Sequence, residues 1–223
     1  MNLYHQCSIK KIISWFWPLA IELRGSNINP YLEVLMDRGR FILNSELENY
    51  SYGPAQTYYR KILRKINLNQ HNIKDTLILG FGVGSIASVL KEEIKLDCSI
   101  KGVEIDSTVL DLGKKYFNIG RFSKTEIILQ DAYDFVFSEK NKFDLIIVDV
   151  TLNLKTPDQF ETFTFLSGLK NLMNTHTVLI LNHQVFSKET RDKVPELESL
   201  FKQCFENVRM YTLMGSGRVF IVN

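Results

Sequence analysis

Three carboxylates stand directly after apolar, strand-like runs of the sequence: Glu104, Asp131 and Asp149. A carboxylate at such a place can accept hydrogen bonds from both hydroxyls of a ribose, accept from an exocyclic amine such as adenine N6, or take a proton from a nucleophile. A charge beside a fully apolar strand is costly unless it is paired or used. Our hypothesis is that Glu104 binds ribose, Asp131 binds adenine and Asp149 is catalytic.

Each of these carboxylates also has a structural explanation. Glu104 could be a solvated strand end, and Asp149 could cap the loop or helix that follows it. Asp131 and Asp134 have the spacing of the N-cap and third position of a short helix, which they would stabilise without any ligand. Asp106 is predicted to be the N-cap of the next helix rather than a ligand.

A glycine-rich loop precedes all three carboxylates along the chain. It follows a strand-like stretch whose apolar run is 77–79 and leads into a helical segment at 85–93. Glycines let a backbone bend sharply and approach a ligand closely. No Gly-Lys-Ser/Thr follows, as a phosphate loop requires, and the third glycine of a dinucleotide loop is replaced by Ser85. The spacing suits a nucleoside thioether cofactor, and we expect these cofactor contacts: Gly80, Phe81, Gly82, Gly84, Glu104, Ile105, Asp131 and Ala132.

Further polar side chains could form the wall of an acceptor pocket. They precede the glycine loop or follow Asp149: Tyr50, Tyr52, Gln56, Tyr59 and Thr151. Helical packing explains Tyr58 or Tyr59 equally well. His183 could reach the same crevice, although a single histidine is more often structural. No group of residues has metal-ligand spacing, so no metal is predicted.

The elements that must position these residues alternate along the chain. Seven strand-like runs are predicted at 75–79, 98–105, 126–130, 143–148, 177–182, 208–213 and 218–222. Helices are predicted between them at 85–93, 108–117, 132–137, 158–172 and 188–204, the last interrupted near Pro195. This alternation, followed by a terminal hairpin, predicts an α/β fold: a doubly wound, seven-stranded, mostly parallel sheet with one antiparallel strand near an edge. Ligands bind such sheets at the carboxyl ends of the strands.

A small antiparallel unit precedes this sheet. Three strands are predicted at 19–24, 31–36 and 40–44, with a loop at 49–54 and a helix at 54–66. Three strands can bury one face only against something else, and the following domain is the obvious candidate. We therefore divide the chain into an N-terminal β-unit, 1–48, and a cofactor-binding domain, 49–223.

Composition limits the classes of partner. The 223 residues carry a formal charge of +2, with Lys and Arg scattered, so neither nucleic acid nor a membrane is predicted as a partner. The three cysteines are far apart and odd in number, which favours a reducing cytoplasm. The apolar segment 12–21 contains two tryptophans but is too short to span a bilayer. It should pack on the body or on a second copy, and it suggests a homodimer.

Together these residues resemble the class I S-adenosylmethionine-dependent methyltransferase fold, and more closely the spermidine synthase (polyamine aminopropyltransferase) family within it. The similarity covers nearly the whole chain. Its more specific parts are Val103-Glu104-Ile105-Asp106 and the apolar strand that ends on Asp149. The resemblance implies S-adenosylmethionine or its decarboxylated form as cofactor, ribose binding by Glu104, adenine binding by Asp131 with Ala132, and activation of an acceptor amine by Asp149.

Three positions differ from the pattern of that family. Val83 replaces the aspartate of Gly-Gly-Gly-Asp-Gly that holds the amine of the aminopropyl donor. Leu152 replaces a second aspartate three residues after the catalytic one, and Tyr59-Arg60-Lys61 replaces Tyr-His-Glu. Each missing charge-assisted contact to a polyamine would cost about 1.5–3 kcal/mol.

These differences lead to three hypotheses about function. The first is an S-adenosylmethionine-dependent methyltransferase that acts on a small-molecule acceptor, because methyl transfer needs little beyond in-line positioning. The second is an aminopropyltransferase that uses decarboxylated S-adenosylmethionine. The third is a non-catalytic cofactor-binding or interaction module, favoured by the reduced acceptor chemistry and the apolar segment with two tryptophans.

Overall fold

Two sheets and the helices around them make up the fold in this computed structural model, which describes residues 9–213 and 217–223. The predicted connection of the last hairpin, 214–216, lies outside the described residues, as does Cys7. The strands are β1 (Leu19–Arg24), β2 (Leu32–Asp37), β3 (Arg40–Ser45), β4 (Asn49–Ser51), β5 (Asp75–Leu79), β6 (Ser99–Glu104), β7 (Thr125–Leu129), β8 (Phe143–Val148), β9 (Met173–Gln184), β10 (Val208–Leu213) and β11 (Gly217–Val222).

The α-helices lie close to the predicted segments, with differences at their ends. They are α2 (Pro54–Ile66), α3 (Ser85–Ser88), α4 (Ser107–Leu112), α5 (Ala132–Ser138), α6 (Phe163–Asn171), α7 (Lys188–Asp192) and α8 (Val194–Cys204). Wider π-helical turns continue α3 and α4 over Val89–Glu93 and Gly113–Phe117. Short 3₁₀ turns cover Leu68–Gln70, Ile119–Arg121 and Asp158–Glu161. The predicted interruption near Pro195 is confirmed, because α7 ends at Asp192 and Pro195 lies in the first turn of α8.

The larger sheet has the predicted seven strands, in the order β10-β11-β9-β8-β5-β6-β7. β11 runs antiparallel to both of its neighbours, and the other neighbouring pairs are parallel. The prediction of a doubly wound, mostly parallel sheet with one antiparallel strand near an edge is therefore confirmed.

Both faces of this sheet are buried because its central strands alternate between two apolar clusters. On β5, Ile78 joins the cluster that contains residues of α2, α3 and α4. Leu77 and Leu79 join the cluster of α5, α6 and α8. Side chains of a strand alternate between its faces, so a continuous apolar run supplies both cores.

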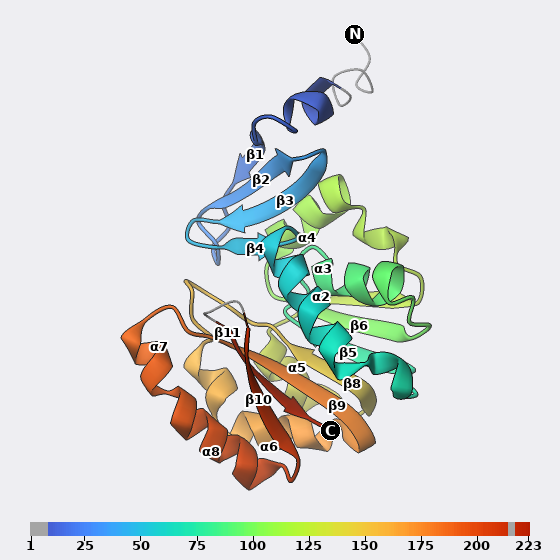
Figure 1. The fold of residues 1–223 in the computed structure, drawn as a ribbon, viewed down its shortest axis with the longest axis vertical. Coiled ribbons are helices and arrows are strands. Elements are labelled where there is room, and N and C mark those ends of the chain that lie inside the picture. Colours follow the sequence, from blue (N-terminus) through green and yellow to red (C-terminus); the bar gives the residue numbers. More distant parts are fainter. Residues whose placement is uncertain (1–8, 214–216) are drawn as a thin grey trace.

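The N-terminal sheet has four strands, in the order β1-β2-β3-β4, where three were predicted. The additional strand β4 lies in the segment expected to be a loop, and it pairs with β3 at Leu43↔Ser51. The Asn49 side chain secures it by donating from Nδ2 to Leu43 O at 3.2 Å and Asn44 Oδ1 at 3.0 Å. Figure 1 shows this sheet at one end of the larger sheet. The division of the chain between residues 48 and 49 stays a prediction.

The two units meet through a polar contact between the loop after β1 and the start of α4. Asp106 caps α4, as predicted, by accepting from the Thr108 backbone N–H at 2.9 Å. Its second oxygen accepts from Ser26 Oγ at 2.5 Å and Asn29 Nδ2 at 2.9 Å, both from the loop between β1 and β2. The Asp106 carboxylate therefore caps the N-terminus of α4 and also binds the loop between β1 and β2 of the N-terminal sheet.

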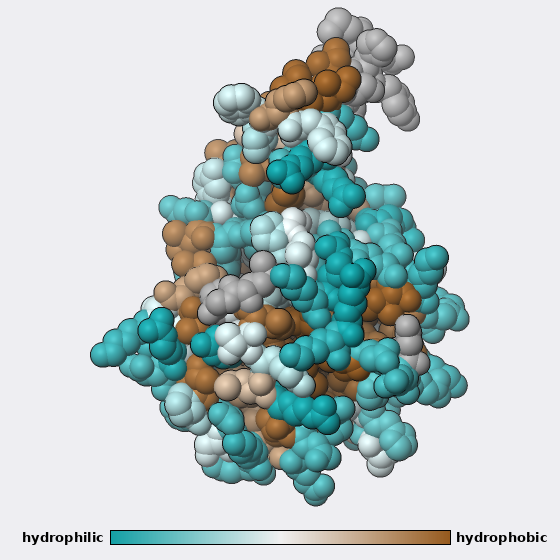
Figure 2. Space-filling view, viewed as in Figure 1, coloured by the Kyte–Doolittle hydropathy of each residue, from teal (hydrophilic) through white to brown (hydrophobic). Residues whose placement is uncertain are grey.

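The apolar segment before β1 lies on the surface of the molecule. Trp15, Phe16 and Trp17 are 67%, 80% and 74% exposed, so this part of the segment does not pack on the body. Figure 2 shows the apolar cluster at the tip of the molecule, beyond the N-terminal sheet. In the part of the chain that the structure describes, no helix is long and apolar enough to cross a membrane.

Candidate active site

A cavity of about 450 Å³ lies at the carboxyl ends of β5, β6 and β8, where the N-terminal sheet meets the larger sheet. The predicted residues that line it are Gly80, Phe81, Gly82, Glu104, Ile105, Asp131, Ala132, Asp149, Tyr50, Tyr59 and Thr151. Parallel strands end at the same edge, which is why residues up to about a hundred positions apart in the sequence meet there.

Gly80 allows the glycine loop and the end of β8 to touch. Its φ is +85°, and a Cβ atom at this position would clash with the carbonyl oxygen of Asp149. The Gly80 N–H donates to Val103 O at 3.0 Å, and the Asp149 N–H donates to Leu79 O at 2.8 Å. An L-residue with a side chain would meet both strain and a steric clash here. The glycine therefore sets the distance between the loop and the predicted catalytic carboxylate.

Glu104 is buried, with 3% of its surface exposed, and both of its oxygens hold backbone. Oε2 accepts from the Gly82 N–H at 2.8 Å, and Oε1 accepts from the N–H groups of Ile105 and Asp106, each at 3.0 Å. Burial raises the pKa of Glu104, and these three backbone donors oppose the rise. A carboxylate oxygen has two acceptor positions, so Oε2 keeps one for a ligand hydroxyl.

Asp131 caps α5 and lines the cavity at the same time. Its Oδ1 accepts from the Tyr133 N–H at 2.6 Å, the N-cap bond expected from its spacing. Its other oxygen has no partner among the described residues, and it can accept from an exocyclic amine. The structural explanation and the cofactor hypothesis are thus compatible, because each uses a different oxygen.

Asp149 belongs to a chain of polar side chains on the opposite wall. Its Oδ1 accepts from Asn182 Nδ2 at 2.9 Å, and Asn182 Oδ1 accepts from the Tyr58 hydroxyl at 2.7 Å. The Tyr59 hydroxyl is near Asp149 but makes no hydrogen bond among the described residues. Burial raises the pKa of Asp149, and the Tyr59 and Asn182 side chains oppose the rise.

Glu48, Tyr58, Asn182 and Gln184 line the cavity but were missed by the sequence analysis. Glu48 lies in the turn between β3 and β4, where the Ser45 N–H donates to its carbonyl at 2.9 Å. Burial and the charge of Asp149 raise the pKa of Glu48 to about 7. No motif surrounds Glu48 in the sequence. Asn182 ends the predicted apolar strand at 177–182, which was the one available indication for it.

Three predicted residues lie outside the lining of this cavity. The Gln56 amide donates to Ser88 Oγ at 3.2 Å and Glu93 Oε1 at 3.4 Å, on the side of α2 that faces α3. The Tyr52 ring stacks on Phe117 with centroids 5.3 Å apart, and its hydroxyl accepts from Arg121. Gly84 packs against Phe122. These residues support the walls of the site from behind.

Val83 and Leu152, which replace aspartates of the family pattern, lie in different environments. Val83 is fully buried in the core beside Gly113, so its side chain points away from the cavity. Leu152 lines the cavity and is partly exposed. Because both side chains are apolar, the cavity has no carboxylate from either position.

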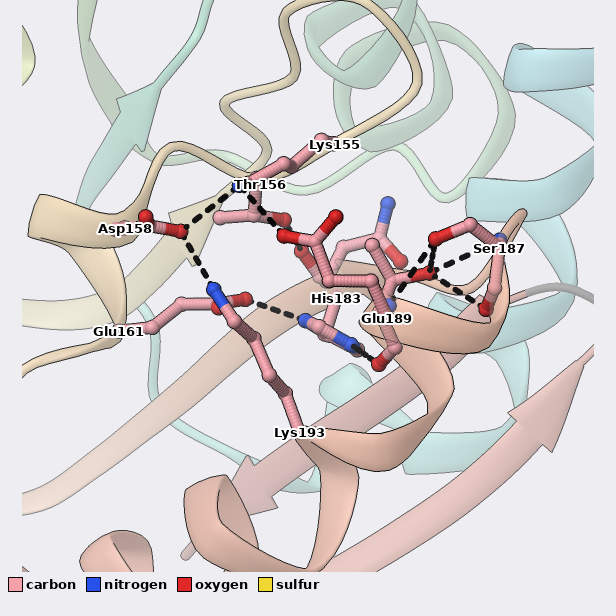
Figure 3. Close-up of polar contacts among 10 residues, drawn as sticks. Lys155, Thr156, Asp158, Glu161, His183, Ser187, Glu189 and Lys193 are labelled. Carbon is pink, nitrogen blue, oxygen red and sulfur yellow. Dashed lines mark hydrogen bonds and ion pairs between the residues drawn. The ribbon is translucent and has the colours of Figure 1, made fainter.

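The loop after β8 lines the cavity through Val150–Leu152, Pro157, Gln159 and Phe160, and ion pairs attach it to α7 and to Lys193 at the start of α8 (Figure 3). Lys155 pairs with Glu189 at 3.0 Å, and Lys193 pairs with Asp158 at 2.6 Å. His183 does not line the cavity. Its Nδ1 contacts the Glu161 carboxylate, and its Nε2 lies 2.8 Å from Thr190 O (Figure 3). His183 is therefore a structural residue that anchors this loop, as the alternative explanation stated.

The charge of the cavity wall is one-sided. Four carboxylates line it, from Glu48, Glu104, Asp131 and Asp149, and among the described residues no Lys, Arg or His does. The other polar groups are neutral amides and hydroxyls, such as Asn29, Asn182 and Tyr58. Such a wall stabilises cations and offers an anionic group no charged partner.

Comparison with known proteins places the chain in a family. A sequence model of the spermine/spermidine synthase domain matches residues 56–215. The polyamine aminopropyltransferase of Buchnera aphidicola subsp. Acyrthosiphon pisum is 30% identical over 175 residues, covering 73% of this chain and 60% of the relative. That of Sulfurisphaera tokodaii is 31% identical over 141 residues, covering 60% and 46%. The chain spans 39% to 60% of the length of such curated relatives.

Solved structures share the fold at lower identity. The spermidine synthase of Thermotoga maritima superposes with a TM-score of 0.71 at 18% identity, covering 91% of this chain and 72% of that one. Human methyltransferase-like protein 13 in complex with SAH gives 0.62 at 20% identity, covering 76% and 80%. These likenesses confirm the methyltransferase-type fold. The match to the family over residues 56–215 goes further, and the chain belongs to the spermine/spermidine synthase family.

Proposed function

We propose that this chain is an aminopropyltransferase that moves the aminopropyl group of decarboxylated S-adenosylmethionine to a small amine. The observation that carries the proposal is the charge of the cavity wall: four carboxylates line it, and no Lys, Arg or His among the described residues does. The donor has a sulfonium and an ammonium group, and the acceptor amine is a cation before it reacts. Intact S-adenosylmethionine also has an α-carboxylate, which would find no charged partner in this wall.

This proposal reverses the order of the first two hypotheses. The first hypothesis follows from the loss of carboxylates of the family pattern at Val83, Leu152 and Lys61. The cavity nevertheless contains a carboxylate that the sequence analysis did not include, Glu48. The relatives from Buchnera aphidicola and Sulfurisphaera tokodaii are named polyamine aminopropyltransferases, which also favours aminopropyl transfer.

The cavity residues have defined roles in this proposal. Glu104 accepts from one ribose hydroxyl through Oε2, and Asp131 accepts from adenine N6, with Ile105 and Ala132 beside the ring. Gly80 and Gly82 allow the backbone to approach the sulfonium. Asp149 binds the amine and aligns its nitrogen with the carbon–sulfur bond. Tyr50, Tyr59 and Thr151 form part of the acceptor wall.

The test is to supply both donors and identify the products. Decarboxylated S-adenosylmethionine with putrescine should yield methylthioadenosine, and intact S-adenosylmethionine should yield no S-adenosylhomocysteine. Asp149→Asn should abolish turnover while calorimetry still detects methylthioadenosine binding. Formation of S-adenosylhomocysteine would instead support the methyltransferase hypothesis. Binding without turnover of any amine, unaffected by Asp149→Asn, would identify a non-catalytic module.

We also propose that two copies associate through the exposed segment before β1 in the cytoplasm. Trp15, Phe16 and Trp17 together expose an apolar surface that a second copy could cover. Sedimentation of Trp15→Ser/Trp17→Ser should give a monomer where the unaltered chain gives a dimer. A monomer in both cases would contradict this proposal without affecting the proposed chemistry.

A further inference from the structure

Glu48 lies in the cavity with Asp149 but comes from a distant part of the chain. It belongs to the turn between β3 and β4 of the N-terminal sheet, whereas Asp149 follows β8 of the larger sheet. Burial and the charge of Asp149 both raise the pKa of Glu48. Two carboxylates close together in a partly desolvated cavity repel each other, unless a cation binds between them. The pair is therefore arranged for a positively charged ligand.

The loop after β8 has a strained turn that faces Glu48. Asn153 and Leu154 are both left-handed, with φ of 53° and 62°. Two backbone hydrogen bonds between Leu152 and Lys155, at 2.9 and 3.2 Å, close the turn around them. Left-handed backbone costs a leucine about 1–2 kcal/mol, and such strain marks functional sites. The Leu154 backbone amide lowers the pKa of Glu48 and so favours its charged form.

The same turn begins with Leu152, where the family pattern has an aspartate. We propose that Glu48 takes the place of that aspartate: Glu48 and Asp149 bind the acceptor ammonium between them, and Glu48 accepts its proton. This inference rests on the proposed aminopropyl transfer. The N-terminal sheet then supplies one of the groups that touch the acceptor, and the two units form the acceptor site jointly.

The reaction step balances with these groups alone. The acceptor enters as R–NH₃⁺, and one proton passes to the Glu48 carboxylate, which frees the nitrogen lone pair. The nitrogen attacks the propyl carbon bound to the sulfonium. The carbon–nitrogen bond forms as the carbon–sulfur bond breaks, and the electron pair of that bond stays on sulfur. The products are a secondary ammonium, methylthioadenosine and the proton, which Glu48 releases to water.

The acidity of Glu48 suits this role. Burial and the Asp149 charge raise the pKa of Glu48 to about 7, and the Leu154 amide opposes the rise. The charged and titratable groups that face Glu48 are Asp149 after β8 and Tyr50 on β4. A base with a pKa near the working pH transfers protons most effectively. Asp149, held by Asn182, is better suited to orient the amine.

The test compares Glu48→Gln with Glu46→Gln, an exposed glutamate two residues earlier in the same turn. Calorimetry would measure putrescine binding to each variant saturated with methylthioadenosine, from pH 5.5 to 8.5. Glu48→Gln should weaken putrescine binding by roughly 10- to 100-fold at pH 8. It should also abolish the rise in affinity through pH 7. Methylthioadenosine binding should not change in either variant.

The outcomes separate this inference from the proposed function. Equal putrescine binding by Glu48→Gln and Glu46→Gln, or no putrescine binding by the unaltered chain, would overturn the role of Glu48. Turnover of decarboxylated S-adenosylmethionine by the unaltered chain is a separate measurement, and its absence would overturn aminopropyl transfer. Binding that depends on Glu48 without turnover would support the acceptor site and reject the reaction.

Discussion

Asn182 joins Asp149 to Tyr58: its amide donates to the Asp149 carboxylate at 2.9 Å, and its carbonyl oxygen accepts from the Tyr58 hydroxyl at 2.7 Å. Asn182 lies in the buried part of β9 and Tyr58 lies on α2, so the contact connects a strand of the larger sheet to a helix. It fixes the orientation of the carboxylate that we propose binds the amine.

Asn182→Ala should lower kcat by roughly 10- to 100-fold, because the Asp149 carboxylate loses a charge-assisted hydrogen bond that orients it. Asn174→Ala is the matched control, since Asn174 lies on the same strand and donates to Asp144 at 2.6 Å at the opposite edge. Steady-state kinetics with putrescine would measure both. An equal effect of the two variants would show that Asn182 acts on stability alone.

Gly80→Ala should destabilise the fold by about 2–5 kcal/mol or prevent folding, because it combines left-handed backbone with a clash against Asp149 O. Gly120→Ala is the control, since a Cβ there would meet nothing within 4 Å. Urea unfolding followed by circular dichroism would measure both variants. Wild-type stability of Gly80→Ala would mean that the loop and the end of β8 can separate at little cost.

Glu104→Ala should weaken methylthioadenosine binding by roughly 10- to 100-fold. The variant loses both the proposed ribose contact and the acceptor of the Gly82 N–H at 2.8 Å. Glu126→Ala, an exposed position on the next strand, should bind as the unaltered chain does. Calorimetry would measure the two dissociation constants. Unchanged affinity of Glu104→Ala would reject this residue as a cofactor contact.

Leu154→Gly should be more stable than Leu154→Ala by about 1 kcal/mol, because both lose the side chain and only glycine relieves the left-handed backbone. This order is the reverse of the one expected in a helix or strand. Thermal unfolding of the two variants side by side would measure the difference. If the alanine variant is the more stable one, the turn over Glu48 carries no strain.

Glu48 should make stability depend on pH in a defined direction. Its pKa is raised from 4.5 to about 7 in the fold, so the unfolded chain ionises first as pH rises. Stability is then lost between about pH 4.5 and 7 and stays lost above. Glu48→Gln should therefore be more stable than the unaltered chain at pH 8, by roughly 1–2 kcal/mol after allowance for partial solvent access, and similar at pH 4.5. Urea unfolding at pH 4.5 and pH 8 would measure the free energy of unfolding, with Glu46→Gln as control. A Glu48→Gln variant that is equally stable or less stable than the unaltered chain at pH 8 would contradict the prediction.

The sequence by itself determined the larger sheet and one wall of the cavity. Apolar runs such as Leu145-Ile146-Ile147-Val148 have the composition of strands buried on both faces. Gly80 and the carboxylates at strand ends were recognisable because each lies next to such a run. Local periodicity specifies these features, and parallel strands bring their ends together without further information.

Only the tertiary structure decided the acceptor side of the cavity. Glu48 and Asn182 lie 134 positions apart by their residue numbers, and no local pattern connects them. Tyr52 and Gln56 could have lined the cavity by sequence, but Arg121 and Ser88 bind them elsewhere. The charge of the wall is also a tertiary property, because it depends on which side chains of distant elements point inward. Packing of the N-terminal sheet against the larger sheet makes that selection.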